Sequence, residues 1–240
     1  MGINISNKKV ITFCDSHEKY VNTSVNSNPS LSLLKQCSPP LLVHSIFKRV
    51  QSNDRRDGNP LIYALKNIDN YSISNEELIK FKPNFVSVLD KLKNNKKFKG
   101  DVILTLPSSS KVVQYFAKRV GRTLSLNVQY DAFVKCTNGE VFDNFNHNIV
   151  RKQDENDVRG ALYTLNKKNP DLPFQIKNIE NSIRSYFQPF KLNQNNNYNQ
   201  YNIILIDDIL STGSSLLCAE QLLKNKCQSI MALTLLGSLR

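Results

Sequence analysis

Long apolar runs, paired cysteines and clustered histidines are all missing from this sequence of 240 residues. No apolar run approaches the roughly 20 residues that cross a bilayer, and the N-terminus lacks a signal-peptide core. We therefore expect a cytoplasmic protein with no membrane partner. The five cysteines are scattered without a Cys-x-x-Cys pair, which favours reduced thiols over disulfides or a zinc site. The three histidines share no ligand spacing.

Acidic residues are also few, with 20 Asp and Glu against 32 Lys and Arg, so that the formal net charge is +12. Such an excess allows attraction to phosphate-bearing partners, from a small pyrophosphate ester to nucleic acid. The chain is rich in Lys, Asn and Ile but has no compact Arg-rich tract. We therefore attribute much of the excess to compositional drift, and a nucleic-acid partner stays open.

Three apolar segments have the composition of strands buried on both faces, as in a parallel sheet. They are Val102–Leu106, Ile203–Ile206 and Ile230–Leu236. The first two are each followed by a small-residue turn and an amphipathic helix. The sequence therefore predicts an α/β protein with a parallel sheet and right-handed crossovers.

The most specific motif begins at the strand Ile203–Ile206. Asp207 and Asp208 follow it, and after two apolar residues comes the turn Ser211-Thr212-Gly213-Ser214-Ser215, which leads into a helix. A turn rich in N–H groups at a helix N-terminus can hold an anion. The two carboxylates repel phosphate and need another partner, such as ribose hydroxyls or a bound metal.

These thirteen positions resemble the phosphoribosyl pyrophosphate (PRPP) motif of the type I phosphoribosyltransferases. The resemblance implies that family's parallel-sheet α/β fold, with Mg²⁺ as cofactor. It also implies that Asp207 and Asp208 hold the ribose hydroxyls and contact the metal indirectly, via PRPP. Ser211, Thr212, Gly213, Ser214 and Ser215 would take the 5′-phosphate. The competing interpretation is an ordinary βα turn that is acidic and serine-capped by accident.

A second turn, Ser108-Ser109-Ser110-Lys111, follows the strand near Val102–Leu106. By position it corresponds to the loop that binds pyrophosphate in the resembled family, although it lacks the commoner Lys-Gly form of that loop. A plain serine cap at a helix N-terminus is an equal alternative. The family also has a mobile basic loop that closes over PRPP, for which Lys135, Arg151 and Lys152 are candidates.

The same resemblance divides the chain into an N-terminal hood or extension, 1–100, and a phosphoribosyltransferase-like core, 101–240. We expect an insertion at about 142–200, before the PRPP motif. Local patterns predict a helix from Ser74, a second helix after Pro83, and a helix after Lys111 that Gly121 ends. They also predict a strand or helix at 41–50 and an Asn-rich linker at 193–202.

The function implied is a pentosyltransferase that transfers or cleaves at the anomeric carbon of PRPP or of a nucleotide, with Mg²⁺. Ser211 stands where purine-salvage enzymes have an aspartate, which argues against a hypoxanthine-guanine enzyme. One alternative is a non-catalytic sensor of PRPP or nucleotides. The other is an antiviral effector of a retron defence system, bound to nucleic acid or to a DNA-binding protein, because Asn59–Lys66 and Pro107–Ser110 resemble that group. The acceptor stays open, as does a homo-oligomer.

Overall fold

The computed structural model describes residues 1–50, 59–108, 110–193 and 197–237. Ser109, one of the predicted pyrophosphate-loop residues, lies outside the described residues. No helix in the described ranges is both long and apolar enough to cross a membrane.

The strands are β1 (Gly2–Ile5), β2 (Val10–Cys14), β3 (Val21–Asn22), β4 (Ser30–Leu34), β5 (Leu41–Arg49), β6 (Ser72–Ile73), β7 (Val102–Thr105), β8 (Asn127–Gln129), β9 (Phe133–Lys135), β10 (Phe190–Leu192), β11 (Tyr198–Ile209) and β12 (Cys227–Leu236). The α-helices are α1 (Pro60–Lys66), α2 (Asn75–Lys93), α3 (Val112–Leu124), α4 (Asn138–Asp143), α5 (Glu155–Asn166) and α6 (Ser214–Leu223).

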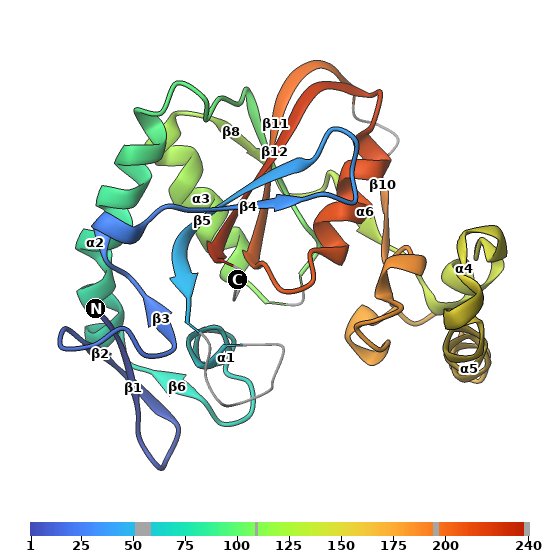
Figure 1. The fold of residues 1–240 in the computed structure, drawn as a ribbon, viewed down its shortest axis with the longest axis horizontal. Helices are drawn as coiled ribbons and strands as arrows, with labels where there is room; N and C mark the ends of the chain where they lie inside the picture. Colours follow the sequence, from blue (N-terminus) through green and yellow to red (C-terminus); the bar gives the residue numbers. More distant parts are fainter. Residues whose placement is uncertain (51–58, 109, 194–196, 238–240) are drawn as a thin grey trace.

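The main sheet has seven strands and is mostly parallel, which confirms the predicted α/β class (Figure 1). Its strand order is β3-β5-β12-β11-β7-β8, with β4 also paired to β5. The strands from β5 to β8 in this order all run parallel, whereas β3 and β4 run antiparallel to β5. Since β5 pairs with β12, the first hundred residues and the rest of the chain share one sheet.

Strand β11 lies inside this sheet and is covered on both faces. Ile204 and Ile206 belong to an apolar cluster with residues of α1, α2 and α3. Ile203 and Leu205 belong to a second cluster with residues of α6. Because successive side chains of a strand point to opposite faces, four apolar residues in a row are what such a strand requires. The predicted two-sided burial at 203–206 is therefore confirmed.

Helix α2 corrects the prediction of two helices separated at Pro83. The helix runs without a break from Asn75 to Lys93 with Pro83 inside it. A proline has no N–H to bond the carbonyl of residue 79, and Ile79 is exposed, so water can reach that end of the turn. Packing of Phe81 and Leu89 on opposite sides of the proline keeps both halves against the core.

Two further local predictions need correction, and one that was left open is resolved. Gly121 does not end α3, which continues to Leu124, and its lack of a side chain allows close approach, since a Cβ there would lie 2.5 Å from Val128 Cγ2. The ambiguous segment 41–50 forms strand β5. The predicted linker 193–202 is in part structured, because β11 already begins at Tyr198.

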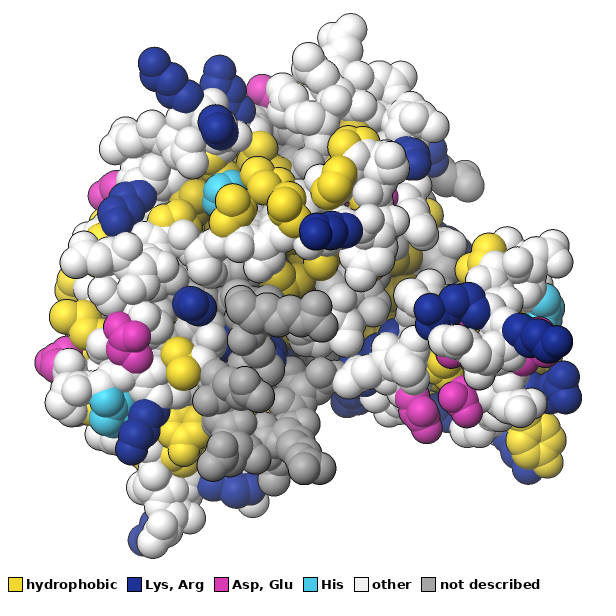
Figure 2. All heavy atoms as spheres, in the orientation of Figure 1, with side chains coloured by type: hydrophobic (Ala, Val, Ile, Leu, Met, Phe, Trp, Pro, Cys, Tyr) yellow, Lys and Arg dark blue, Asp and Glu magenta, His cyan; other side chains and the backbone are white. Residues whose placement is uncertain are grey.

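Residues 136–189 form a lobe between β9 and β10, which pair with each other antiparallel. The lobe contains α4, α5 and its own apolar cluster, which includes Val158, Phe174 and Phe187. In Figure 1 it stands to the right of the main sheet, and Figure 2 shows it projecting from the body of the molecule. Helix α5 contributes Val158, Leu162 and Leu165 to this cluster.

Candidate functional site

The direction of chain winding reverses between β7 and β11. From β7 the chain passes outward to β8 on one side, whereas β11 and β12 lie on the other side. Open α/β sheets bind ligands at such a switch point, beyond the carboxyl ends of the strands. The N–H of Leu106 donates to the carbonyl of Ile206 over 3.0 Å, and then the two chains separate. Beyond this point β11 pairs only with β12, which leaves Asp207 and Asp208 at the opening.

Both aspartates lie within the last residues of β11, not after the strand as the sequence predicted. Asp208 is 4% exposed, and its carboxylate forms an ion pair with Lys66 at the end of α1. The backbone N–H of Asp208 donates to Asp207 Oδ1 over 2.8 Å. Burial, aided by the charge of Asp208, raises the pKa of Asp207 to about 7. The carboxyl of Asp207 therefore changes its charge near neutral pH.

The turn 211–215 connects β11 to α6 and is held by its own hydroxyl groups. Ser211 Oγ accepts from the N–H of Thr212 over 2.6 Å, and Thr212 Oγ1 lies 2.8 Å from Ser214 Oγ. Helix α6 begins at Ser214, so the N–H groups of its first turn, including that of Ser215, have no acceptor inside the helix. These N–H groups and hydroxyls give the turn the donors that an anion requires.

Gly213 makes this turn possible for two reasons. Its φ of 80° lies in the left-handed region, which residues with a Cβ avoid. A Cβ at this position would also lie 2.8 Å from Leu34 Cδ1 of β4. The turn is therefore fixed both by backbone conformation and by contact with an edge strand of the main sheet.

The second turn, after β7, uses its serines mainly to build the start of α3. Ser108 Oγ accepts from the N–H of Ser110 over 3.2 Å, and Ser110 Oγ accepts from the N–H of Val112 over 3.1 Å. The second bond joins a hydroxyl to the first N–H of the helix, but Lys111 holds the N-cap position and no side chain caps α3, so the serine-cap alternative is not met. Lys111 is exposed next to it. Ser108 also faces the cavity described next.

A cavity of about 180 Å³ lies at the switch point. It brings together five of the residues predicted from the sequence: Ser108, Lys135, Asp207, Asp208 and Ser215. Two further lysines line it, Lys66 from α1 and Lys177 from the lobe. Three cations thus surround two acids and two hydroxyls, an arrangement suited to a ligand that carries both phosphate and hydroxyl groups. We call this the strand-end cavity.

Other predicted residues lie outside the strand-end cavity. Arg151 NH2 is held by Asp154 at 2.8 Å, and its Nε donates to the hydroxyl of Tyr186 over 3.0 Å. With Thr212 and Ser214 it lines a larger groove of about 1090 Å³ between the lobe and α6. Lys152 is exposed on the lobe. The structure thus places one of the three lid candidates, Lys135, at the cavity, while the other two lie elsewhere on the lobe.

Sequence reasoning missed Lys66 and Lys177. Lys66 is the last residue of a helix that starts with the Asn59-Pro60 capping pair, in which the Asn59 side chain accepts from the N–H of Leu61. That pair predicts a helix but gives no sign of what its end contacts. Lys177 lies in the lobe, to which the sequence assigned no chemistry. Both reach the cavity only because distant segments fold against β11.

No protein-family model matches the sequence, and no curated protein is significantly similar to it. Among solved structures, the adenine phosphoribosyltransferase of Leishmania tarentolae shares 10% identity and a TM-score of 0.38, covering 98% of this chain and 94% of that one. The adenine phosphoribosyltransferase of Leishmania donovani shares 10% identity and a TM-score of 0.39, with 98% and 86% covered. At these values the likeness carries no weight for function, which rests on the geometry of the strand-end cavity.

Proposed function

We propose that the protein binds PRPP in the strand-end cavity and acts as a pentosyltransferase at its anomeric carbon. One observation carries the proposal: two adjacent aspartates, Ser215 in the first turn of α6 and three lysines line one cavity at the switch point of a parallel sheet. A sugar with a vicinal diol and a phosphate at each end has a partner for every one of these groups. A ligand without the diol would leave the carboxylates facing its phosphates.

Each residue of the cavity has a distinct role in this proposal. Asp207 and Asp208 accept hydrogen bonds from the 2′ and 3′ hydroxyls, which fixes the ribose over the end of β11. The turn 211–215 binds the 5′-phosphate through N–H and hydroxyl groups. Lys135 and Lys177, with Ser108, face the remaining end of the cavity and neutralise the pyrophosphate.

The reaction exchanges one bond at the anomeric carbon for another. The bond to the pyrophosphate oxygen breaks, that oxygen keeps the electron pair, and a nucleophile forms the new bond. Positive charge develops on the ribose while negative charge grows on the leaving group. The aspartates stabilise the positive charge on the ribose, and the lysines stabilise the negative charge on the pyrophosphate. Both signs of charge in the cavity therefore lower the barrier.

The residues present fit a magnesium ion that arrives with the ligand. Among the described residues no three His, Cys, Asp or Glu side chains lie together as a metal site. Mg²⁺ commonly binds through substrate phosphates and water with few protein ligands, and Asp207 and Asp208 would meet the ion indirectly, via the PRPP that they hold. When bound, the ion would add to the neutralisation of the leaving group.

A non-catalytic PRPP or nucleotide sensor is the second candidate, and one observation favours it. The hydroxyls of Ser108 and Ser110 accept bonds inside their own turn, where the pyrophosphate loop was predicted. Each hydroxyl keeps its O–H donor, but Lys111, the cation of that predicted loop, does not line the cavity. Without this cation the cavity can hold the ribose and 5′-phosphate firmly while stabilising the leaving group weakly. Such a protein would bind without turnover.

Calorimetry with Mg²⁺ and PRPP tests the binding, and pyrophosphate release with pooled bases tests the reaction. We expect binding by the native protein, severe loss in Asp208→Asn, and no change in Asp171→Asn, which removes an exposed acid of the lobe. Binding together with pyrophosphate release supports the transferase, and binding without release supports the sensor. No heat with PRPP or with any nucleoside 5′-monophosphate would refute both.

A further inference from the structure

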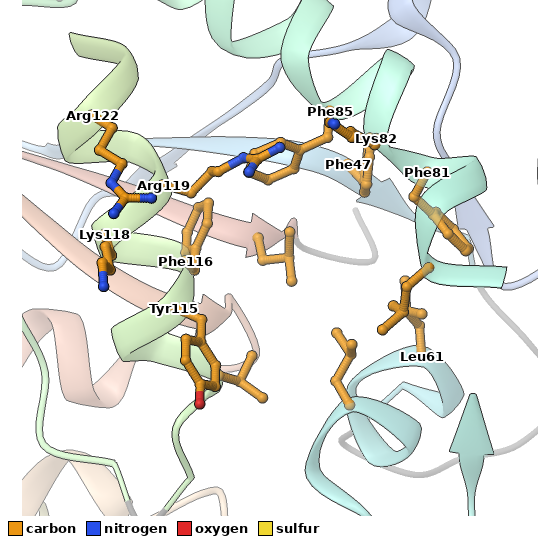
Figure 3. Close-up of a pocket in the computed structure, with 14 residues that line it drawn as sticks. Phe47, Leu61, Phe81, Lys82, Phe85, Tyr115, Phe116, Lys118, Arg119 and Arg122 are labelled. Carbon is orange, nitrogen blue, oxygen red and sulfur yellow. The ribbon is translucent and has the colours of Figure 1, made fainter. Parts of the chain in front are cut away.

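A second cavity, of about 660 Å³, lies between α1, α2 and α3 (Figure 3). Its floor is a chain of phenylalanines: the ring of Phe47 lies 6.4 Å from those of Phe81 and Phe85, and Phe85 lies 6.1 Å from Phe116. Leu61 and Leu65 of α1 close it on one side. We call this the apolar cup. Small-molecule sites in proteins commonly have this size and an apolar lining.

The rim of the cup carries four cations and, among the described residues that line it, no acid. Lys82 lies on α2, and Lys118, Arg119 and Arg122 lie on α3. The three on α3, with Tyr115, follow the i, i+3, i+4, i+7 spacing of one helix face. In Figure 3 the Arg119 side chain extends across the cup towards Phe85. None of the four forms an ion pair with another residue in the described part of the chain.

The ligand chemistry follows from an apolar hollow beside four cations that pair with no acid in the described part of the chain. The floor is made of hydrocarbon side chains and offers no hydrogen-bond partner, so a nucleobase would bury its polar edge unsatisfied. An acyl chain needs no such partner, and each methylene that it buries adds affinity. A carboxylate or phosphate head group would be matched by the rim, where arginine forms charge-assisted bonds.

We propose that the apolar cup binds a free long-chain acyl anion, with its chain against the phenylalanine floor and its head group at Arg119 and Arg122. The concave shape favours a single free amphiphile over a bilayer surface, because a membrane lipid would have to leave its bilayer to reach the floor. This site is separate from the strand-end cavity and does not depend on PRPP binding. The two cavities share only α1, through Leu65 and Lys66.

Calorimetry with sodium tetradecanoate below its critical micelle concentration tests the proposal on the full chain. We expect one site per chain, and affinity lowered on the order of tenfold by the double variant Arg119→Gln/Arg122→Gln. The matched control is Lys93→Gln/Lys96→Gln, which removes the same charge at and just beyond the end of α2, outside the cup, and should bind as the native protein does. Asp207→Asn should also leave tetradecanoate binding unchanged, whatever its effect on PRPP.

Two further ligands separate the remaining explanations. Tetradecanol has the same chain without the charge, and vesicles of phosphatidylglycerol present an anionic bilayer surface. Tetradecanol should bind more weakly than the acid, because the rim then has no charge to meet. Absence of heat with tetradecanoate would refute the site, as would equal weakening in both double variants, since that would indicate general charge attraction. Binding to vesicles or to an acidic amphipathic peptide, without binding of the free acid, would also refute it. Thermal melting of each variant shows whether it is folded.

Discussion

The strand-end cavity and the apolar cup share helix α1 but have opposite chemistry. The first is small, lies where strands end, and combines two acids, two hydroxyls and three lysines. The second is larger, lies where helices meet, and has cations only at its rim. The difference follows from what each kind of element exposes. Strand ends and helix N-termini present backbone N–H groups and small polar residues, whereas helices packed on a sheet turn apolar stripes inward.

Asp208→Asn should give the largest difference between ligand affinities at the two sites. We expect PRPP affinity to fall about 100-fold or more, since the change leaves Lys66 unpaired and removes a charged acceptor from a buried position. Tetradecanoate binding should stay within twofold of native. Calorimetry with each ligand on the same sample measures both. A parallel fall in both affinities would mean that α1 had moved and that the sites are coupled.

Gly213→Ala should disturb the strand-end cavity through the backbone alone. The positive φ and the contact with Leu34 predict a loss of about 2 kcal/mol in the free energy of unfolding. The matched control is Gly160→Ala in α5, where a Cβ would meet nothing within 4 Å. That control should gain about 0.5–1 kcal/mol, because alanine favours a helix over glycine. Urea unfolding of both variants measures these changes in the free energy of unfolding. Equal changes in the two variants would contradict a strained turn at Gly213.

Lys66→Met tests whether α1 contributes a ligand-binding cation to the strand-end cavity. Lys66 of this helix lines that cavity, whereas Leu65 lines the cup. We expect PRPP affinity to fall about tenfold, because a cation facing the ligand and Asp208 is lost. The similar length of methionine should keep α1 in place, so tetradecanoate binding should be unchanged. Lys80→Met on α2, where the lysine pairs with Glu77, provides a control outside both sites. Unchanged PRPP binding in Lys66→Met would leave Lys66 a structural partner only.

The difference in pH-dependent stability between the native protein and Asp207→Asn should report on Asp207, because the shifted pKa values of His44 and Glu77 are common to both proteins. The pKa of Asp207 in the folded protein, about 7, lies above the ordinary 3.8, so the folded state keeps a proton that the unfolded chain has lost between these values. Stability therefore falls as pH rises through this window and levels off above it. Asp207→Asn should remove the part of this fall that is due to Asp207. At pH 8 the free energy of unfolding should then exceed that of the native protein by up to about 4 kcal/mol, since each of about three pKa units is worth about 1.4 kcal/mol, and Tm should rise. Identical pH profiles for native and variant would contradict the raised pKa.

The part of the site that the sequence predicted is the part built from neighbouring residues. The strand 203–206, the acids after it and the turn 211–215 are continuous in the chain, and their burial pattern and glycine have local causes. Lys66 and Lys177 were not predicted, because their approach to Asp208 depends on how α1 and the lobe fold against β11. Gly121 was misinterpreted for a similar reason: it lies in helix α3, and the side chain that it must accommodate, Val128, belongs to strand β8.

The sequence by itself determined the α/β class, the buried strand β11 and a glycine-containing turn beside two acids. These follow from apolar runs, residue size and local hydrogen bonding, which act over a few residues. Only the tertiary structure decided that β5 completes the sheet, that three lysines meet the acids and that four rim cations surround the apolar cup. Those arrangements depend on contacts between distant segments, which no local pattern records.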